Sequence, residues 1–130
     1  MRILSSLLLM FVLVSCSCSD NHYTKSEMYK LGVQFDSNLE LILPKDMASG
    51  IQCSDYGPGC LSGHEIKVRK VTMIAVEFEE EEQACTEALR LDQYCKFNWL
   101  FDDIHGEPVL EDFVVRAFGA VRPSQQTPSN

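Results

Sequence analysis

Residues 71–82, VTMIAVEFEEEE, hold the pattern from which the fold is predicted. The run from Val71 to Val76 is apolar except at Thr72, which is typical of a central strand buried on both faces of its sheet. Four glutamates follow at 79–82, and carboxylates favour the first turn of a helix because they face the positive end of its dipole. The stretch therefore predicts a buried strand that leads directly into a helix.

The predicted helix carries a narrow apolar stripe. Its members recur at the spacing of one helix face and are Ala84, Ala88, Leu91 and Cys95. The acidic run is therefore interpreted as a helix start rather than as a cation site. A short strand at 99–101 and a polar turn at 102–106 follow. A second helix is predicted from Pro108, which suits the first helical position, to Gly119, which suits the C-cap.

Upstream of this segment, apolar residues alternate with polar ones. The alternation over 29–35 and again over 39–43 predicts two strands joined as a hairpin. Residues 44–63 show no periodicity, which predicts a long loop of the kind that often carries function. The segment 66–78 reads as one strand, with a bulge or bend where the apolar phase slips at 69–70.

These elements define the predicted fold class, an α+β domain, and the length of 130 residues suits one such domain. The predicted order is β-β-β-α-β-α. Two helices are expected to cover one face of a small, mainly antiparallel sheet. In an alternative arrangement, the segment 71–104 forms a β-α-β unit with its two strands parallel.

The N-terminus reads as an export signal. A charged start precedes an apolar run that is too short for a bilayer span, which needs about 20 apolar residues. The tetrapeptide that closes this run, Leu13-Val14-Ser15-Cys16, resembles the lipobox of bacterial lipoproteins, and the resemblance covers residues 1–16 only. It implies cleavage before Cys16 and attachment of a diacylglyceryl group to the cysteine sulfur. The alternative is an ordinary signal cleaved near Ser17 or Ser19, which would give a secreted protein.

The resemblance to lipoproteins implies a location and a domain organisation. The expected parts are a signal peptide (1–15), a lipidated polar tether (16–27), a single α+β domain (28–121) and a disordered tail (122–130). The implied location is the bacterial cell envelope, with the lipid on Cys16 inserted in a membrane. Ser17 after the lipidated cysteine implies the outer membrane if the organism is Gram-negative.

The charge of the chain disfavours some classes of partner. The formal net charge is −8, from 19 acidic and 11 basic residues. Such an acidic surface disfavours binding to nucleic acid and electrostatic docking on anionic lipid. It permits a cationic partner, such as a basic envelope protein, without requiring one.

The cysteines predict one disulfide. Cys53 and Cys60 bracket a turn-rich segment, and closing that ring in an oxidising envelope would stabilise the fold by about 2.5 kcal/mol. Cys85 and Cys95 are expected not to pair, since ten residues of intact helix would separate them by about 15 Å, beyond the reach of a disulfide. They are interpreted as buried thiols, with a cross-link to the loop as the alternative.

The turn after the strand at 99–101 holds the strongest candidate binding surface. Its polar side chains are Asp102, Asp103, His105 and Glu107. One histidine is too few for a typical zinc site and the spacing does not match a calcium loop, so no metal site is predicted. The chain has no recognisable catalytic or phosphate-binding motif, so neither catalytic residues nor a cofactor are predicted.

The sequence therefore favours a non-enzymatic lipoprotein, tethered through Cys16, whose small domain binds another envelope component. The expected partner is an unidentified envelope protein, and the expected contact surfaces are the loop 44–63 and the turn 102–107. The alternative function is a small secreted or envelope hydrolase in which Asp103 and His105 act as an acid–base pair.

Overall fold

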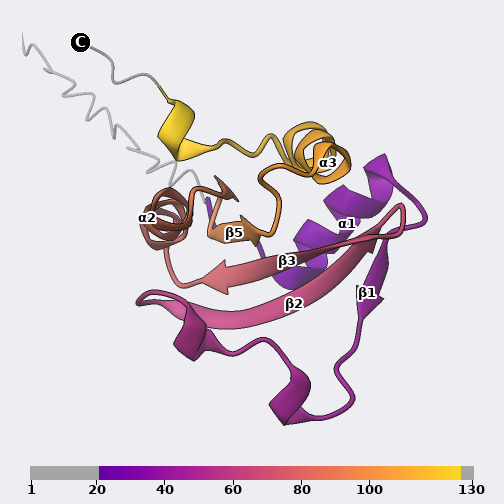
Figure 1. The fold of residues 1–130 in the computed structure, drawn as a ribbon, viewed down its shortest axis with the longest axis horizontal. Coiled ribbons are helices and arrows are strands. Elements are labelled where there is room, and N and C mark those ends of the chain that lie inside the picture. The colour runs from indigo at the N-terminus through magenta and orange to yellow at the C-terminus, as the bar shows by residue number, and fades with distance from the viewer. Residues whose placement is uncertain (1–20, 127–130) are drawn as a thin grey trace, which may run out of the picture.

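A five-stranded antiparallel sheet organises residues 21–126, the part of the chain that the computed structural model describes (Figure 1). In chain order the elements are α1 (Lys25–Phe35), β1 (Glu40–Ile42), β2 (Cys60–Val68), β3 (Val71–Phe78), α2 (Glu81–Leu91), β4 (Tyr94–Lys96), β5 (Trp99–Asp102) and α3 (Pro108–Phe118). The strands lie in the order β1-β2-β3-β5-β4. The predicted α+β class with a small antiparallel sheet is confirmed, whereas the order of the elements differs.

The central strand β3 is apolar on both faces and therefore supports two separate cores. Met73 and Ala75 pack into a core with α1 and α3, while Val76 and Phe78 pack into a second core with α2. The helices thus cover both faces of the sheet, not one face as expected. The predicted buried strand and the helix start after it are both confirmed, since α2 begins at Glu81.

The first element is a helix, and the prediction of a strand at 29–35 was wrong. Thr24 and Glu27 form a capping box, in which the Thr24 hydroxyl accepts from the Glu27 backbone N–H at 3.2 Å and the Glu27 carboxylate accepts from the Thr24 N–H. Met28 and Gly32 are buried at helical spacing. The apolar residues of this segment fit both the two-residue period of a strand and the 3.6-residue period of a helix. The capping box at Thr24 favours the helix.

The apolar phase slip at Arg69–Lys70 marks a turn between two strands instead of a bulge within one. Arg69 and Lys70 both have positive φ (47° and 71°), as a tight two-residue hairpin requires, and Val68 pairs with Val71 across it. The irregularity in the β2–β3 pairing lies at the other end, between Cys60 and Ser62. The alternative with parallel strands is also wrong, because β3 pairs with β5 antiparallel.

Two disulfides lie on the described part of the chain. Cys53 and Cys60 are joined as predicted, with their Cα atoms 5.5 Å apart. Cys85 and Cys95 are also joined, with a Cα separation of 5.2 Å, which corrects the expectation that they cannot pair. That expectation assumed one helix through Cys95, but α2 ends at Leu91, Asp92 adopts the left-handed conformation, and β4 brings Cys95 back beside Cys85.

The segment between β1 and β2 is shorter than predicted and partly packed. Its first part forms the lower edge of the molecule in Figure 1, whereas Tyr56, near its end, packs against the core beneath α2; the segment ends at Cys60, where β2 begins. Ile51 covers Gly63 so closely that a Cβ at Gly63 would overlap the Ile51 side chain. The Tyr56 hydroxyl donates to Asp102 at 2.8 Å, which fastens the segment to the end of β5.

The chain ends differ from the predicted tether and tail. Helix α1 begins at Lys25, within the expected tether. Residues 121–126 are ordered: Val121 and Cys95 exchange backbone hydrogen bonds, and the Arg122 guanidinium donates to both oxygens of Asp92 at 2.9 and 2.6 Å. The proposed lipidation site Cys16, the signal peptide and residues 127–130 lie outside the described residues.

Two findings bear on location. Disulfides persist in oxidising compartments, so the two pairs indicate an extracytoplasmic protein. Among the helices within residues 21–126, none has the length and apolar character needed to cross a membrane.

Removing the Cys85–Cys95 disulfide tests the corrected path of the chain. Replacing both cysteines with alanine should lower the free energy of unfolding by about 2–3 kcal/mol, because the bond restricts the unfolded chain. Urea unfolding followed by circular dichroism measures the loss. The Cys53→Ala/Cys60→Ala variant, compared with and without reductant, isolates the Cys85–Cys95 bond and is the control for packing changes. Peptide mapping without reduction that found Cys85 and Cys95 as free thiols would contradict the path.

A candidate binding cavity between α1 and the sheet

An open cavity of about 350 Å³ lies between α1 and the sheet. Side chains from β3 and β5 form its most buried part, with Ala75, Trp99 and Phe101 each no more than 3% exposed. Leu41 and Ile66, from β1 and β2, extend the lining along the sheet. The volume lies within the range of about 300–1,000 Å³ that is usual for small-molecule sites.

The interior of this cavity is apolar. An enclosed apolar cavity of about 150 Å³ is enough to bind benzene, so this one has room for a larger apolar group. Aromatic rings dominate its deep end, where Phe101 stacks on Phe118 with ring centroids 4.9 Å apart. Binding there would be driven by removal of apolar surface from water.

Polar groups gather at the mouth. Lys25 and Ser26 come from the first turn of α1, Tyr29 from its second turn, and His64 from β2. None of the residues that line the cavity is acidic, although the chain has 19 acidic residues. Burial, together with the nearby Lys25 ammonium, lowers the pKa of His64. His64 is therefore largely neutral at pH 7, and Lys25 supplies the positive charge.

A second hollow of about 360 Å³ adjoins the first and shares Lys25, Leu41 and His64 with it. It continues along the edge of the sheet toward Leu43 and Met47, whose side chains are 75% and 93% exposed. The apolar lining therefore extends from the interior to the surface of the protein.

A buried amide holds α1 in place over the sheet. The Asn98 side chain accepts from the Tyr23 backbone N–H at 2.7 Å and donates to the Phe78 carbonyl at 3.1 Å. The Trp99 indole donates to the Tyr23 carbonyl at 2.7 Å, and the Tyr23 ring stacks on Phe97. Tyr23, two positions before α1, is thus fixed to the β4–β5 turn. This attachment sets the position of the cavity mouth at the start of α1.

The structure directs the side chains of the 102–107 turn, the surface predicted for binding, to different partners within the protein. Asp102 accepts from Tyr56, and burial together with Asp102 raises the pKa of that phenol. Asp103 is exposed, and its pKa is raised by partial burial and by Asp102. Glu107 occupies the N-cap of α3 without a side-chain capping bond.

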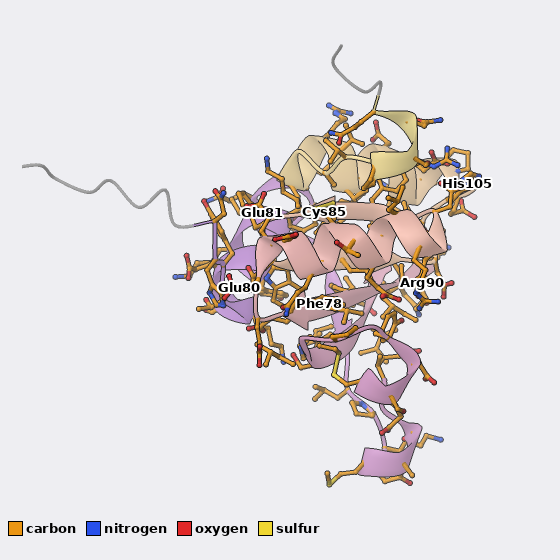
Figure 2. The ribbon with its side chains drawn as sticks, turned by 90° about the vertical axis from the view of Figure 1, so that its left-hand side faces the viewer. Phe78, Glu80, Glu81, Cys85, Arg90 and His105 are labelled. Atoms are coloured by element: carbon orange, nitrogen blue, oxygen red, sulfur yellow. A yellow bond between two sulfur atoms is a disulfide. The ribbon has the colours of Figure 1, made fainter. Side chains whose placement is uncertain are left out.

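His105 is engaged by groups other than Asp103. Its Nδ1 lies 3.6 Å from Asp92, and its Nε2 lies 3.5 Å from the Arg122 guanidinium. Arg122, the main cause, and Ser124 hold the pKa of Asp92 at about 2. Figure 2 shows His105 at the Arg90 end of α2, opposite Glu80 and Glu81. Within residues 21–126, no hydrogen bond or ion pair joins the side chains of Asp103 and His105.

One further pair has the distance of a nucleophile and base. The Ser62 hydroxyl lies 3.0 Å from His64 Nε2, at the edge of the cavity. Among residues 21–126, no carboxylate hydrogen-bonds to His64 to orient its ring, as the third member of a catalytic triad would. Within the same residues, no group of three or more His, Cys, Asp or Glu side chains is placed to hold a metal ion.

The structure is that of a disulfide-bonded, extracytoplasmic α+β protein with an open apolar cavity. Comparison of the chain with protein-family models, with characterised proteins and with solved structures finds no match. Sequence reasoning missed the cavity because its lining comes from α1, the sheet and α3, which no local motif connects. The capping box at Thr24 is a sequence signal that could have identified α1 as a helix, although not its position over the sheet.

Removing the Asn98 amide should loosen the N-terminal segment over the cavity. In Asn98→Ala, the Tyr23 N–H and the Phe78 carbonyl lose a buried partner, and we expect a loss of more than about 2 kcal/mol of unfolding free energy. Urea unfolding measures the loss, with the exposed Asn38→Ala as the matched control. Equal stability of the two variants would contradict this role of Asn98.

Proposed function

We propose that this chain is a bacterial lipoprotein of the cell envelope, anchored through lipid on Cys16, whose domain captures another envelope component without catalysis. The observation that carries the proposal is the open apolar cavity beneath α1, lined by Trp99 and Phe101. Extracytoplasmic disulfides and the lipobox-like Leu13-Val14-Ser15-Cys16 sequence support the location.

The short distance along the chain between anchor and cavity supports the same proposal. Lys25, at the cavity mouth, follows Cys16 by nine residues, and nine residues span at most about 30 Å. A protein anchored at Cys16 would therefore keep its cavity close to the membrane surface. Envelope components at that surface would be the accessible ligands.

Binding is favoured over hydrolysis by the contacts of the candidate catalytic groups. His105 interacts with Asp92 and Arg122, and both of those residues hold the C-terminal segment against the end of α2. These contacts give His105 a structural role in holding the C-terminal segment in place. The cavity instead offers a large apolar surface with few polar groups, which suits capture by burial.

The anchor is tested by the mass of the mature protein from membrane fractions. We expect a chain that starts at Cys16, carries acyl groups and contains two disulfides. Cys16→Ser should release the protein from the membrane, since multiple acyl chains give stable anchoring, whereas Cys18→Ser should leave it bound. An unmodified start near Ser17 or Ser19 would make the protein a secreted factor and overturn the anchor.

The cavity is tested by photo-cross-linking in intact cells. A photoreactive amino acid at Tyr29, which is 45% exposed at the cavity mouth, should give cross-linked products. The matched control is Val115 on α3, which is 46% exposed and does not line the cavity. Leu41→Glu should suppress the products at Tyr29, because a carboxylate in an apolar site disfavours binding. Equal products at Tyr29 and Val115 would contradict the proposal.

A further inference from the structure

We infer that the ligand of the cavity is an acyl chain with an anionic headgroup, with the chain packed against Trp99 and the headgroup at Lys25. This inference rests on the proposed function and specifies the class of envelope component that the domain captures. The shape of the site, its charge and the position of Lys25 each support it.

The shape of the site fits an elongated apolar ligand. The two hollows adjoin each other, since Lys25, Leu41 and His64 line both, and together they give an elongated site. The site begins at Trp99, which is 2% exposed, and ends near Met47, which is 93% exposed. A flexible chain can follow such a site from the interior to the surface.

The charge at the mouth fits an anion. The overall charge of −8 repels anions, so any attraction must be local. Lys25 is exposed, and none of the ion pairs within residues 21–126 involves its ammonium group. The adjoining hollow has one acidic residue, Glu65, on β2.

Hydrogen-bond donors flank Lys25 at the same mouth. Ser26 and Tyr29 line the cavity beside Lys25, and each carries a hydroxyl of the kind that can donate to a carboxylate or phosphate oxygen. Lys25 and Ser26 also lie in the first turn of α1, where the helix dipole favours negative charge. Glu27 in that turn already caps Thr24.

Trp99 gives a direct measurement because it is the single tryptophan of the chain and it lines the cavity. The whole mature chain with both disulfides, carrying Cys16→Ser so that its own acyl groups are absent, is titrated with 9,10-dibromostearate. Bromine quenches indole fluorescence on contact. We expect saturable quenching that unbrominated stearate reverses. A second titration uses a brominated lysophosphatidylglycerol, whose headgroup is a phosphate instead of a carboxylate. Comparison of the two titrations distinguishes a fatty acid from a phospholipid as the ligand, and saturable quenching by either supports the inference.

Two pairs of variants test the two ends of the ligand. Lys25→Glu should weaken binding by about fivefold, whereas Lys30→Glu, an exposed position on the same helix, should leave it unchanged. Leu41→Glu should weaken binding by about tenfold or more, while Leu89→Glu on α2 should not. Circular dichroism of each variant confirms that the fold is retained. The methyl ester of dibromostearate, which has no charge, should bind as weakly to wild type as the acid binds to Lys25→Glu.

Three results would overturn the inference. One is the absence of saturable quenching by both ligands. Another is equal binding of acid and ester together with equal binding by the two lysine variants. The third is that dibromostearate binds the Cys16→Ser protein but not the protein that carries lipid on Cys16. The acyl groups of the protein's own anchor would then be the occupant of the cavity. In each case, cross-linking at Tyr29 that Leu41→Glu suppresses would leave the proposed function standing, and loss of that cross-linking would remove it as well.

Discussion

The segment that leads into α1 is fixed by one buried side chain, the amide of Asn98, while Met28 and Phe35 pack the helix itself into the core. The Asn98 amide is fully buried, and both of its polar atoms bond to backbone groups, one before α1 and one at the end of β3. A buried amide is stabilising only when its partners are in place, so it specifies a single arrangement of these segments. The cavity exists because this arrangement holds the start of α1 above the sheet while leaving space between Lys25 and Trp99.

The two faces of the sheet differ in how completely they are filled. On the α2 face, Val76 and Phe78 are fully buried, and the Cys85–Cys95 disulfide joins the helix to the edge strand β4. On the other face, Ala75 lies at the centre of β3 and leaves volume that a larger side chain would occupy. The sheet thus has one closely packed face and one face that leaves an open cavity.

Local signals predicted the elements that depend on local physics. The apolar run at β3, the carboxylates before α2, and Pro108 and Gly119 at the ends of α3 each act within a few residues, and the structure confirms them. Alternation over 29–35 failed because the same residues also fit a helical period. The apolar stripe through Cys95 failed because a left-handed Asp92 ends the helix and a strand then returns the chain. The cavity depends on contacts between distant segments, which periodicity does not encode.

The open cavity links ligand binding to stability. The cavity leaves the side chains of Trp99, Phe101 and Ile66 without packing partners on one side. This unfilled volume forfeits contacts that the folded chain could otherwise gain, so the empty site lowers the stability of the domain. A ligand that fills the site binds the folded state only, and its binding free energy therefore adds to the free energy of unfolding. The two disulfides restrict the unfolded chain and thereby offset the loss of stability caused by the empty cavity, without occupying it. Cross-links of this kind allow a small domain to keep an apolar interior accessible, which is the property that the proposed capture of an acyl chain requires.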